Sequence, residues 1–180
     1  MKFCTHCGHP LVLKTPPGDH LPRYVCEHCG AIHYENPRVV VGCVAEWQHK
    51  VLLCRRAIEP RAGLWTLPAG FLENDETVEQ GARRESREEA LAEVEILAPL
   101  ALVNVPHVHQ VHLMFRARLA QGRHGVGAES LETSLFDEAS IPWPEIAFPS
   151  VRYTLECFFA DRRREKFEFH ITTWSKPLSA

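Results

Sequence analysis

The sequence lacks the features that mark membrane-spanning and secreted proteins. No apolar run reaches the roughly 18 residues that a membrane-spanning helix needs, and the first residues, MKFCTHCG, hold no apolar stretch like that of a secretory signal. A basic excess is missing as well, because 23 acidic residues outnumber 20 basic ones and the formal net charge is −3. Such a balance exerts no general attraction on nucleic acid or anionic lipid. We therefore expect a cytoplasmic protein without a membrane partner, and the charge balance disfavours nucleic acid as a partner.

The chain also lacks low-complexity tracts and any Ser/His/Asp arrangement that would suggest covalent acyl chemistry. Its apolar content of 45% and charged content of 24% are ordinary for a globular protein. At 180 residues it has room for one domain, or for one domain and a small module. Seven cysteines is an odd number, and four of them stand in two Cys-x-x-Cys units. Without a predicted secretory signal, this arrangement favours metal binding over disulfides.

Two near copies of a zinc knuckle lie close to the start of the chain, CTHCG at residues 4–8 and CEHCG at residues 26–30. Two residues between the thiolates let both sulfurs reach one tetrahedral ion, and the glycine that follows permits a sharp turn. Short strands are predicted at residues 11–14 and 23–25. We predict a zinc ribbon over residues 1–36, whose folding depends on the metal because so short a stretch buries too little core.

The predicted ligands of one structural Zn²⁺ are Cys4, Cys7, Cys26 and Cys29. Four thiolates complete a tetrahedral site, and a site without an open position has no catalytic role. A pair of disulfides and a set of redox-active thiols are the alternatives for these cysteines.

The stretch from residue 70 to residue 92, GFLENDETVEQGARRESREEALA, concentrates carboxylates on a predicted helix. Glu85 and Glu89 lie one turn apart on an inward face, and no basic residue stands three or four positions from either of them. Buried carboxylates repel each other and are costly to desolvate, and a hard cation such as Mg²⁺ or Mn²⁺ removes both costs. A solvated face of ion pairs, such as Arg84 with Glu88, is the alternative.

The same residues resemble the Nudix box. That pattern is glycine, five residues, glutamate, seven residues, Arg-Glu, an apolar residue, any residue, Glu-Glu, any residue, glycine and an apolar residue. Here it corresponds to Gly70, Glu76 and the run RESREE that begins at Arg84, with LPAGF around the glycine. Two positions depart from the pattern. Ser86 replaces an apolar residue, and Leu91 replaces a glycine, so a left-handed helix exit there would be strained by roughly 1 kcal/mol.

The resemblance covers nearly the whole chain and implies an α/β fold. We expect a Nudix α/β/α sandwich with a mixed sheet over residues 37–180, preceded by the small N-terminal zinc ribbon of residues 1–36. By resemblance, Glu76 pairs with Arg84 and braces the loop. The residues implied to hold Mg²⁺ or Mn²⁺ are Glu85, Glu88 and Glu89, with the carbonyl of Ala69 as a further ligand.

A glutamate outside the box completes the metal site or acts as general base in many Nudix enzymes. Glu132 and Glu129 are the two candidates here, and two solvated loop carboxylates are the alternative. Arg56 is expected to bind substrate phosphate, unless it is ordinary surface charge. Trp65 either stacks on a base or packs in the core.

The resemblance also implies the reaction, which is hydrolysis of the pyrophosphate in a nucleoside diphosphate linked to another moiety. Ribbon-bearing Nudix proteins include NADH pyrophosphatases and enzymes that split FAD or ADP-ribose. The first group carries a Ser-Gln-Pro-Trp-Pro-Phe-Pro motif after the box, where this chain has LALVNVPHVHQVH. We therefore expect ADP-ribose or FAD as the substrate, with AMP released. An NADH pyrophosphatase, an RNA-decapping enzyme and a non-catalytic binding protein are the alternatives.

The remaining pattern predicts the elements around the box. A β-branched run followed by a turn predicts a hairpin of strands, and the last apolar alternation predicts a strand that pairs within the domain or across a homodimer. The predicted strands are residues 38–46, 51–55, 94–105, 110–119 and 166–174, and the predicted helices are residues 77–90 and 151–162.

Overall fold

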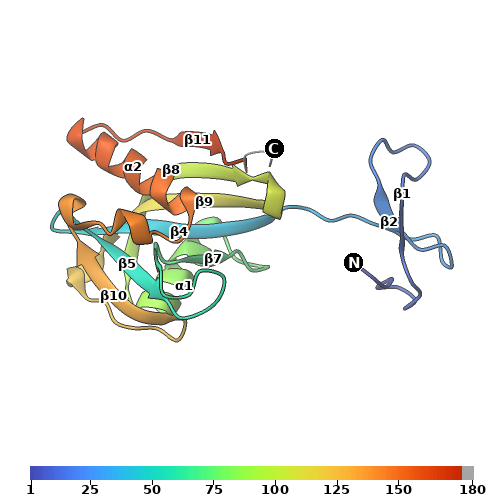
Figure 1. Cartoon of the computed structure of the whole chain (residues 1–180), viewed down its shortest axis with the longest axis horizontal. Coiled ribbons are helices and arrows are strands. Elements are labelled where there is room, and N and C mark those ends of the chain that lie inside the picture. The colour runs from blue at the N-terminus through green and yellow to red at the C-terminus, as the bar shows by residue number, and fades with distance from the viewer. Residues whose placement is uncertain (176–180) are drawn as a thin grey trace. The chain divides into compact units, whose positions relative to one another are not determined.

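The computed structural model describes residues 1–175 and divides into two compact units, Met1–Asn36 and Pro37–Ala180 (Figure 1). The first unit is a three-stranded antiparallel sheet in the order β1-β2-β3. Its strands are β1 (Val12–Lys14), β2 (Arg23–Val25) and β3 (Ile32–His33). In the described part of the chain, no helix is long and apolar enough to span a bilayer.

The two knuckles of the first unit share one backbone geometry. In the first, the N–H of Gly8 donates to the carbonyl of Cys4 at 2.9 Å, and in the second the N–H of Gly30 donates to the carbonyl of Cys26 at 2.9 Å. Both glycines have positive φ, 74° and 75°, a conformation that glycine adopts without strain. The repeated sequence therefore produces the same tight turn twice and points each pair of thiols in a common direction.

The second unit is built on a mixed sheet in the order β10-β5-β4-β9-β8-β11, to which β6 adds beside β5 and β7 beside β4. The β4–β9 and β8–β11 pairs are parallel, and the other pairs are antiparallel. The strands are β4 (Arg38–Trp47), β5 (Lys50–Arg56), β6 (Trp65–Thr66), β7 (Ala69–Phe71), β8 (Val94–Val105), β9 (Gln110–Leu119), β10 (Ser130–Phe136) and β11 (His170–Thr173).

Two helices cover opposite faces of this sheet, α1 (Val78–Ala90) on one side and α2 (Pro149–Arg163) on the other (Figure 1). Side chains alternate along β4, so that Val44 joins the apolar cluster beneath α2 while its neighbour Cys43 joins the cluster beneath α1. The predicted α/β sandwich with a mixed sheet is confirmed. Four short 3-10 helices connect the described elements: η1 (Pro106–Val108), η2 (Ala120–Gly122), η3 (Glu138–Ser140) and η4 (Trp143–Glu145).

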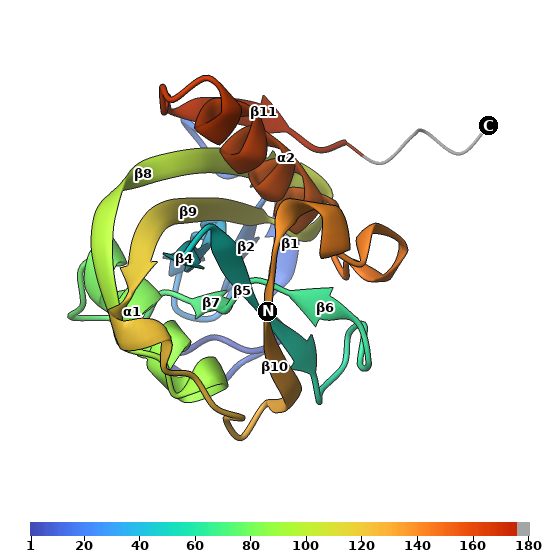
Figure 2. The ribbon, with the colours of Figure 1, turned by 90° about the vertical axis from the view of Figure 1, so that its left-hand side faces the viewer.

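The long strands β8 and β9 bend as they cross the unit, as Figure 2 shows. The pairing register shifts between Ile96 and Ala98 and again between Pro99 and Ala101. Such irregularities bend a strand and increase its twist. The last strand, β11, pairs in parallel with β8 of the same chain. Of the two pairings predicted for the last strand, the structure has the one within the domain. The homodimer stays a prediction.

Helix α1 begins and ends with defined caps. The side chain of Thr77 accepts a hydrogen bond from the N–H of Gln80, and the side chain of Gln80 accepts one from the N–H of Thr77, which makes a capping box. At the other end Leu91 has φ 47° and ψ 32°, a left-handed conformation, and its N–H donates to the carbonyl of Arg87. A β-carbon is strained in this conformation, as the departure from the box pattern predicts.

Replacing Leu91 by glycine is expected to raise the free energy of unfolding by about 1 kcal/mol, because glycine adopts positive φ without strain. The side chain of Leu91 is mostly exposed, so little packing is lost. Urea denaturation of the two proteins measures the difference. Leu91→Ala is the matched control, since it removes the side chain but keeps the strained β-carbon. If the alanine variant gained as much stability as the glycine variant, strain would not be the cause.

Candidate active site

Glu85 and Glu89 point from α1 toward strand β7. Oε2 of Glu89 accepts a hydrogen bond of 3.1 Å from the N–H of Ala69. The carboxylate of Glu85 lies against Gly70, where a Cβ atom would be 2.4 Å from Oε1 of Glu85. Any side chain at position 70 would therefore collide with this carboxylate. Only 8% of Glu85 and 6% of Glu89 are exposed, so this face of the helix is turned inward, as its spacing predicts.

Burial raises the pKa of both carboxyl groups. For Glu89 desolvation is the largest cause and the charges of Glu85 and Glu129 add to it, so that the pKa rises to about 8. Desolvation also raises the pKa of Glu85, against the opposing effect of its hydrogen bond with Arg84. A hard divalent cation would relieve both the desolvation and the repulsion, and carboxylate oxygens are the ligands that Mg²⁺ and Mn²⁺ prefer. The chemistry of these donors therefore suits such an ion, while among the described residues no three carboxylates lie within 4.8 Å of one another.

Glu88 is separate from the buried pair. Its side chain is 59% exposed, and Oε2 lies 3.1 Å from Nη1 of Arg84. The same Nη1 lies 2.6 Å from Oε1 of Glu85. Glu85 therefore has a basic partner on its own helix, although no basic residue stands three or four positions from it. Spacings of three and four residues omit Arg84, whose long side chain reaches the carboxylate of its immediate neighbour.

Arg84 also binds the loop before the helix. Its Nε is 3.1 Å from Oε2 of Glu76 and its Nη2 is 2.7 Å from Oε1, a bidentate pair. Nη2 donates a further hydrogen bond of 3.0 Å to the carbonyl of Phe71, and Glu76 accepts one of 2.8 Å from the N–H of Glu73. The hydrogen bonds from Arg84 keep the pKa of Glu76 below its usual value. Glu76 thus holds the loop in place, the arrangement that the resemblance implies.

The glycine-rich loop before β10 packs on the last turn of α1. The N–H of Gly125 donates to the carbonyl of Ala90 at 2.7 Å, and the N–H of Gly127 donates to the carbonyl of Glu89 at 3.1 Å. A Cβ atom on Gly127 would lie 1.8 Å from the carbonyl oxygen of Glu88. Only glycine fits at position 127, a requirement that the sequence signals only through the Gly-x-Gly spacing in this loop.

This contact places Glu129 near the buried pair, and its negative charge raises the pKa of both Glu85 and Glu89. Glu132 lies further along β10, beside Arg55 of β5, with Oε2 3.8 Å from Nη1 of that arginine. Of the two glutamates that the sequence suggests outside the box, the structure therefore places Glu129 near the carboxylate pair and Glu132 in a surface ion pair.

Arg56 lies at the end of β5, close enough to Glu89 that its positive charge opposes the rise in the pKa of that carboxyl. Its Nε donates to the carbonyl of Pro60 at 2.9 Å, and its guanidinium lies 5.1 Å from the ring centroid of Phe148. These contacts hold the positively charged guanidinium of Arg56 at the rim of the carboxylate pair, where it could bind an anionic substrate.

Trp65 does not present its ring to a ligand. Only 7% of the residue is exposed, and its ring packs edge-to-face on Phe136 with 4.9 Å between the centroids. The carbonyl of Trp65 accepts a hydrogen bond of 2.8 Å from Ala147, which fixes the backbone as well. Of the two roles considered for Trp65, its burial supports packing, because the core covers most of the indole.

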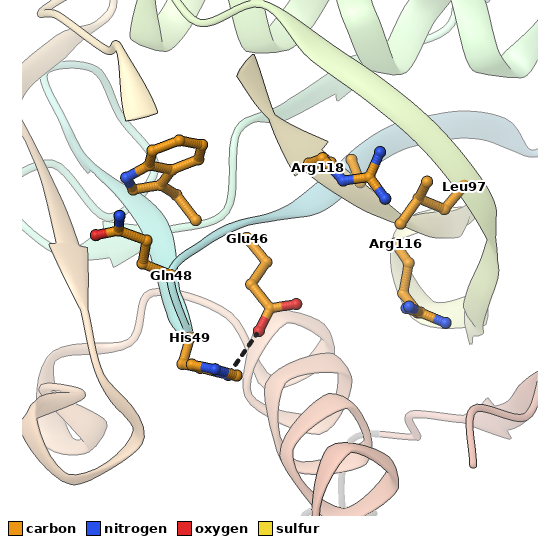
Figure 3. Close-up of a pocket in the computed structure, with 8 residues that line it drawn as sticks. Glu46, Gln48, His49, Leu97, Arg116 and Arg118 are labelled. Carbon is orange, nitrogen blue, oxygen red and sulfur yellow. Dashed lines mark ion pairs between the residues drawn. The ribbon is translucent and has the colours of Figure 1, made fainter. Parts of the chain in front are cut away.

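A surface pocket of about 380 Å³ lies elsewhere on the second unit (Figure 3). It contains none of the box residues, and its polar groups include an ion pair between Glu46 and His49. The side chains that line it are Glu46, Trp47, Gln48, His49, Leu97, Arg116, Ala117 and Arg118. The carboxylate pair therefore lies outside this pocket.

In the first unit the four knuckle cysteines converge on one point. The Sγ atoms of Cys4 and Cys29 are 3.7 Å apart, and those of Cys7 and Cys26 are 3.5 Å apart. The sulfurs of a tetrahedral site with zinc–sulfur bonds of 2.3 Å would be separated by about 3.8 Å. The four thiols therefore fit a zinc ion, and Nε2 of His33, 3.3 Å from Sγ of Cys4, adds an outer contact.

Comparison with known protein families agrees with this geometry. Residues 2–35 match the family described as Nudix N-terminal, a zinc ribbon, and residues 36–152 match the NUDIX domain. The chain therefore belongs to the Nudix family and carries a zinc ribbon in front of the Nudix domain. A crystal structure of a NUDIX hydrolase from Nitrosomonas europaea is 49% identical, covers 97% of this chain and 100% of that one, and superposes with a TM-score of 0.91.

Two curated relatives have named activities. An NAD-capped RNA hydrolase, NudC, from Edwardsiella ictaluri is 31% identical over 67% of this chain and 45% of its own length. An ADP-ribose pyrophosphatase from Methanocaldococcus jannaschii is 30% identical over 61% of this chain and 67% of its own length. The chain thus spans about half the length of the NudC relative that it matches.

Proposed function

We propose that this protein is a divalent-metal-dependent pyrophosphohydrolase that cleaves a nucleoside diphosphate linked to another moiety and releases AMP. The observation that carries the proposal is the buried pair of Glu85 and Glu89 beneath β7, in a family whose other members include a named pyrophosphatase. Two enclosed carboxylates without a cation are costly. We propose that Glu85, Glu88, Glu89 and the carbonyl of Ala69 hold Mg²⁺ or Mn²⁺, and that zinc in the ribbon is structural.

When bound, the divalent ion neutralises the charge of the pyrophosphate, which would otherwise repel an incoming water. The protein's own residues do the rest. Arg84 holds Glu85 in position, and Arg56 orients a phosphate at the rim of the site. Glu129 accepts the proton of the attacking water as general base. The catalytic unit in this proposal is residues 37–180, and residues 1–36 form the separate ribbon domain.

ADP-ribose and FAD are the proposed substrates. The name of the Methanocaldococcus jannaschii relative supports ADP-ribose, and the segment after the box lacks the motif of the NADH pyrophosphatases. The name of the Edwardsiella ictaluri relative favours one second candidate, removal of an NAD cap from RNA. The acidic balance of the chain weighs against an RNA substrate, because phosphate contacts to RNA come from clustered basic residues.

Turnover of a substrate panel in Mg²⁺ tests the proposal. The panel is ADP-ribose, FAD, NADH, NAD, dinucleoside polyphosphates and NAD-capped RNA, with products separated by chromatography. AMP from ADP-ribose or FAD at the highest kcat/KM is the expected result. Cleavage of capped RNA alone would keep the carboxylate chemistry and replace the substrate class. Absence of cleavage with either Mg²⁺ or Mn²⁺ would leave a binding protein on a Nudix scaffold.

The choice of Glu129 as general base predicts unequal effects for two conservative variants. Glu129→Gln is expected to lower kcat by roughly 10²-fold, the size of a general-base contribution. Glu132→Gln is the matched control on the same segment, and we expect less than about a threefold change because Glu132 is half exposed and pairs with Arg55. Steady-state kinetics on ADP-ribose measures both. A larger loss in Glu132→Gln would reverse the assignment.

The raised pKa of Glu89 predicts how metal binding depends on pH. The ordinary pKa of a glutamate is 4.5, and that of Glu89 in the folded protein is about 8. Between these two pH values, Glu89 keeps its proton in the folded metal-free protein and has lost it in the unfolded chain. The free energy of unfolding of the metal-free protein therefore falls as the pH rises through this window. Mg²⁺ must displace the proton, so its apparent affinity is expected to rise about tenfold per pH unit in this window. Thermal unfolding with and without Mg²⁺ at several pH values measures this. A pH trend that persists in Glu89→Gln would contradict it.

A further inference from the structure

A second cluster of metal-ligating side chains lies beside the four-cysteine site. Ligand atoms of Cys7, His9 and His28 all lie within 4.8 Å of one another. The cluster takes Cys7 and His9 from the first knuckle and its flank, and His28 from the second knuckle. Position 31, which corresponds to position 9 in the other knuckle, is alanine. The cluster is therefore specific to one side of the ribbon, and Cys7 belongs to both groups.

The tautomer of His9 suits metal binding. Its Nδ1 lies 3.2 Å from the carbonyl oxygen of Cys7, and because a carbonyl only accepts hydrogen bonds, Nδ1 carries the hydrogen. The lone pair is then on Nε2. A hydrogen bond from one ring nitrogen to a backbone carbonyl is the usual way in which proteins orient a histidine whose other nitrogen binds a metal.

His28 is held next to His9. The two rings stack with 3.6 Å between the centroids and 5° between the planes, and both residues are exposed. Among the described residues, neither ring forms an ion pair with a carboxylate. Two imidazoles gathered over a thiol, without an anionic partner, form a set of nitrogen and sulfur donors.

We propose that Cys7, His9 and His28 bind a second transition-metal ion of the Zn²⁺ class, with the Cys7 thiolate bridging it to the structural zinc. Imidazole and thiolate are ligands that select Zn²⁺ over Mg²⁺ or Ca²⁺. Ligand atoms on a tetrahedral zinc are about 3.3 to 3.8 Å apart, close to the spacing of these groups. Because the two rings are parallel and imidazole lone pairs lie in the ring plane, one exposed ring must also rotate out of the stack for both to meet the same ion.

The second ion is held more weakly than the first. It has three protein ligands, so one position stays open to water or another ligand, whereas the four thiolates form a closed site. Two of its ligands are exposed, and one thiolate is shared between two cations. The second ion therefore exchanges with ions in solution, whereas the structural zinc of the same ribbon stays bound.

Cadmium-113 NMR of the full chain tests this proposal directly. The protein is stripped of metal and loaded with one equivalent of ¹¹³Cd²⁺. Further ¹¹³Cd²⁺ is then added in the presence of excess Mg²⁺, which occupies the box carboxylates. The expected result is a first resonance from the tetrathiolate site and a second from the mixed site, with scalar coupling between them through the sulfur of Cys7. Coupling requires a shared ligand, so cadmium bound to carboxylates elsewhere does not produce it.

Histidine variants complete the test. His9→Ala and His28→Ala are expected to remove the coupled resonance and to weaken binding of the second ion at least about tenfold, while the first resonance is retained. His20→Ala is the matched control, an exposed ribbon histidine outside the cluster, and it is expected to keep both signals. A single ribbon resonance in the unaltered protein, or a second resonance that survives both cluster variants, would overturn the proposal.

Discussion

Glu85→Gln is expected to lower kcat/KM by roughly 10²- to 10⁴-fold while the protein stays folded. The amide keeps the shape of the side chain against Gly70 but removes one of the two buried carboxyl groups. Because burial raises the pKa of Glu85, loss of its charge also removes a desolvation cost. The metal-free variant should therefore unfold at or above the temperature of the original protein, and activity and stability should change in opposite directions.

The control for this prediction is Glu93→Gln. Glu93 also lies near the end of α1, but it is exposed and pairs with Arg87 at 2.8 Å, away from β7. We expect its kcat/KM to stay within about a factor of two of the original, as for a surface ion pair. Thermal unfolding in Mg²⁺ adds a second readout, since Glu85→Gln should lose most of the stabilisation by the ion. If Glu85→Gln kept the activity of the original protein, the proposed mechanism would be ruled out.

Cys26→Ser is expected to abolish zinc binding and to unfold the ribbon of residues 1–36. Cys26 is fully buried, and besides it only Cys4, Pro16 and Val25 are buried in this unit. So small a core cannot offset the chain entropy, whereas structural zinc supplies about 10 to 16 kcal/mol of apparent binding free energy in zinc-finger peptides. Amide hydrogen exchange should show protection lost in residues 1–36 and retained in β4 and β9 of the other unit.

Cys157→Ser is the matched control, because Cys157 lies on α2 of the second unit, is partly buried and belongs to no cysteine cluster. It should retain the zinc content of the unaltered protein by atomic absorption and normal exchange protection in the ribbon. Chelation of zinc from the unaltered protein should reproduce the exchange pattern of Cys26→Ser. Protection of residues 1–36 that survives both treatments would mean that contacts other than the metal stabilise the ribbon.

The parts of the site that follow from sequence are those set by neighbouring residues. Cys-x-x-Cys-Gly produces the same turn in both knuckles because the geometry closes within five residues. The inward face of α1 follows from the helical repeat, which places Glu85 and Glu89 one turn apart whatever surrounds them. The left-handed end of α1 at Leu91 follows from the family pattern. The structure has this conformation, but leucine is strained in it where glycine would not be.

The parts that sequence does not predict depend on where distant segments meet. Glu129 and Glu132 are equivalent along the chain, and they differ only because Gly125 and Gly127 fix the loop on α1 and direct Glu129 toward the box. Trp65 has the same side chain whether it meets a ligand or Phe136. Neither distinction has a local signal, since each results from packing between segments far apart in sequence.

The sequence by itself determined the family and predicted the two metal chemistries and the carboxylates involved, because helix periodicity and ligand spacing are local properties. Only the tertiary structure decided that Arg84 joins Glu76, Glu85 and Glu88, that Glu129 lies near the buried pair, and that one cysteine of the ribbon faces two stacked histidines. The physical reason is that burial and charge coupling depend on distances in space. Those distances are set by strand register and loop closure rather than by residue order.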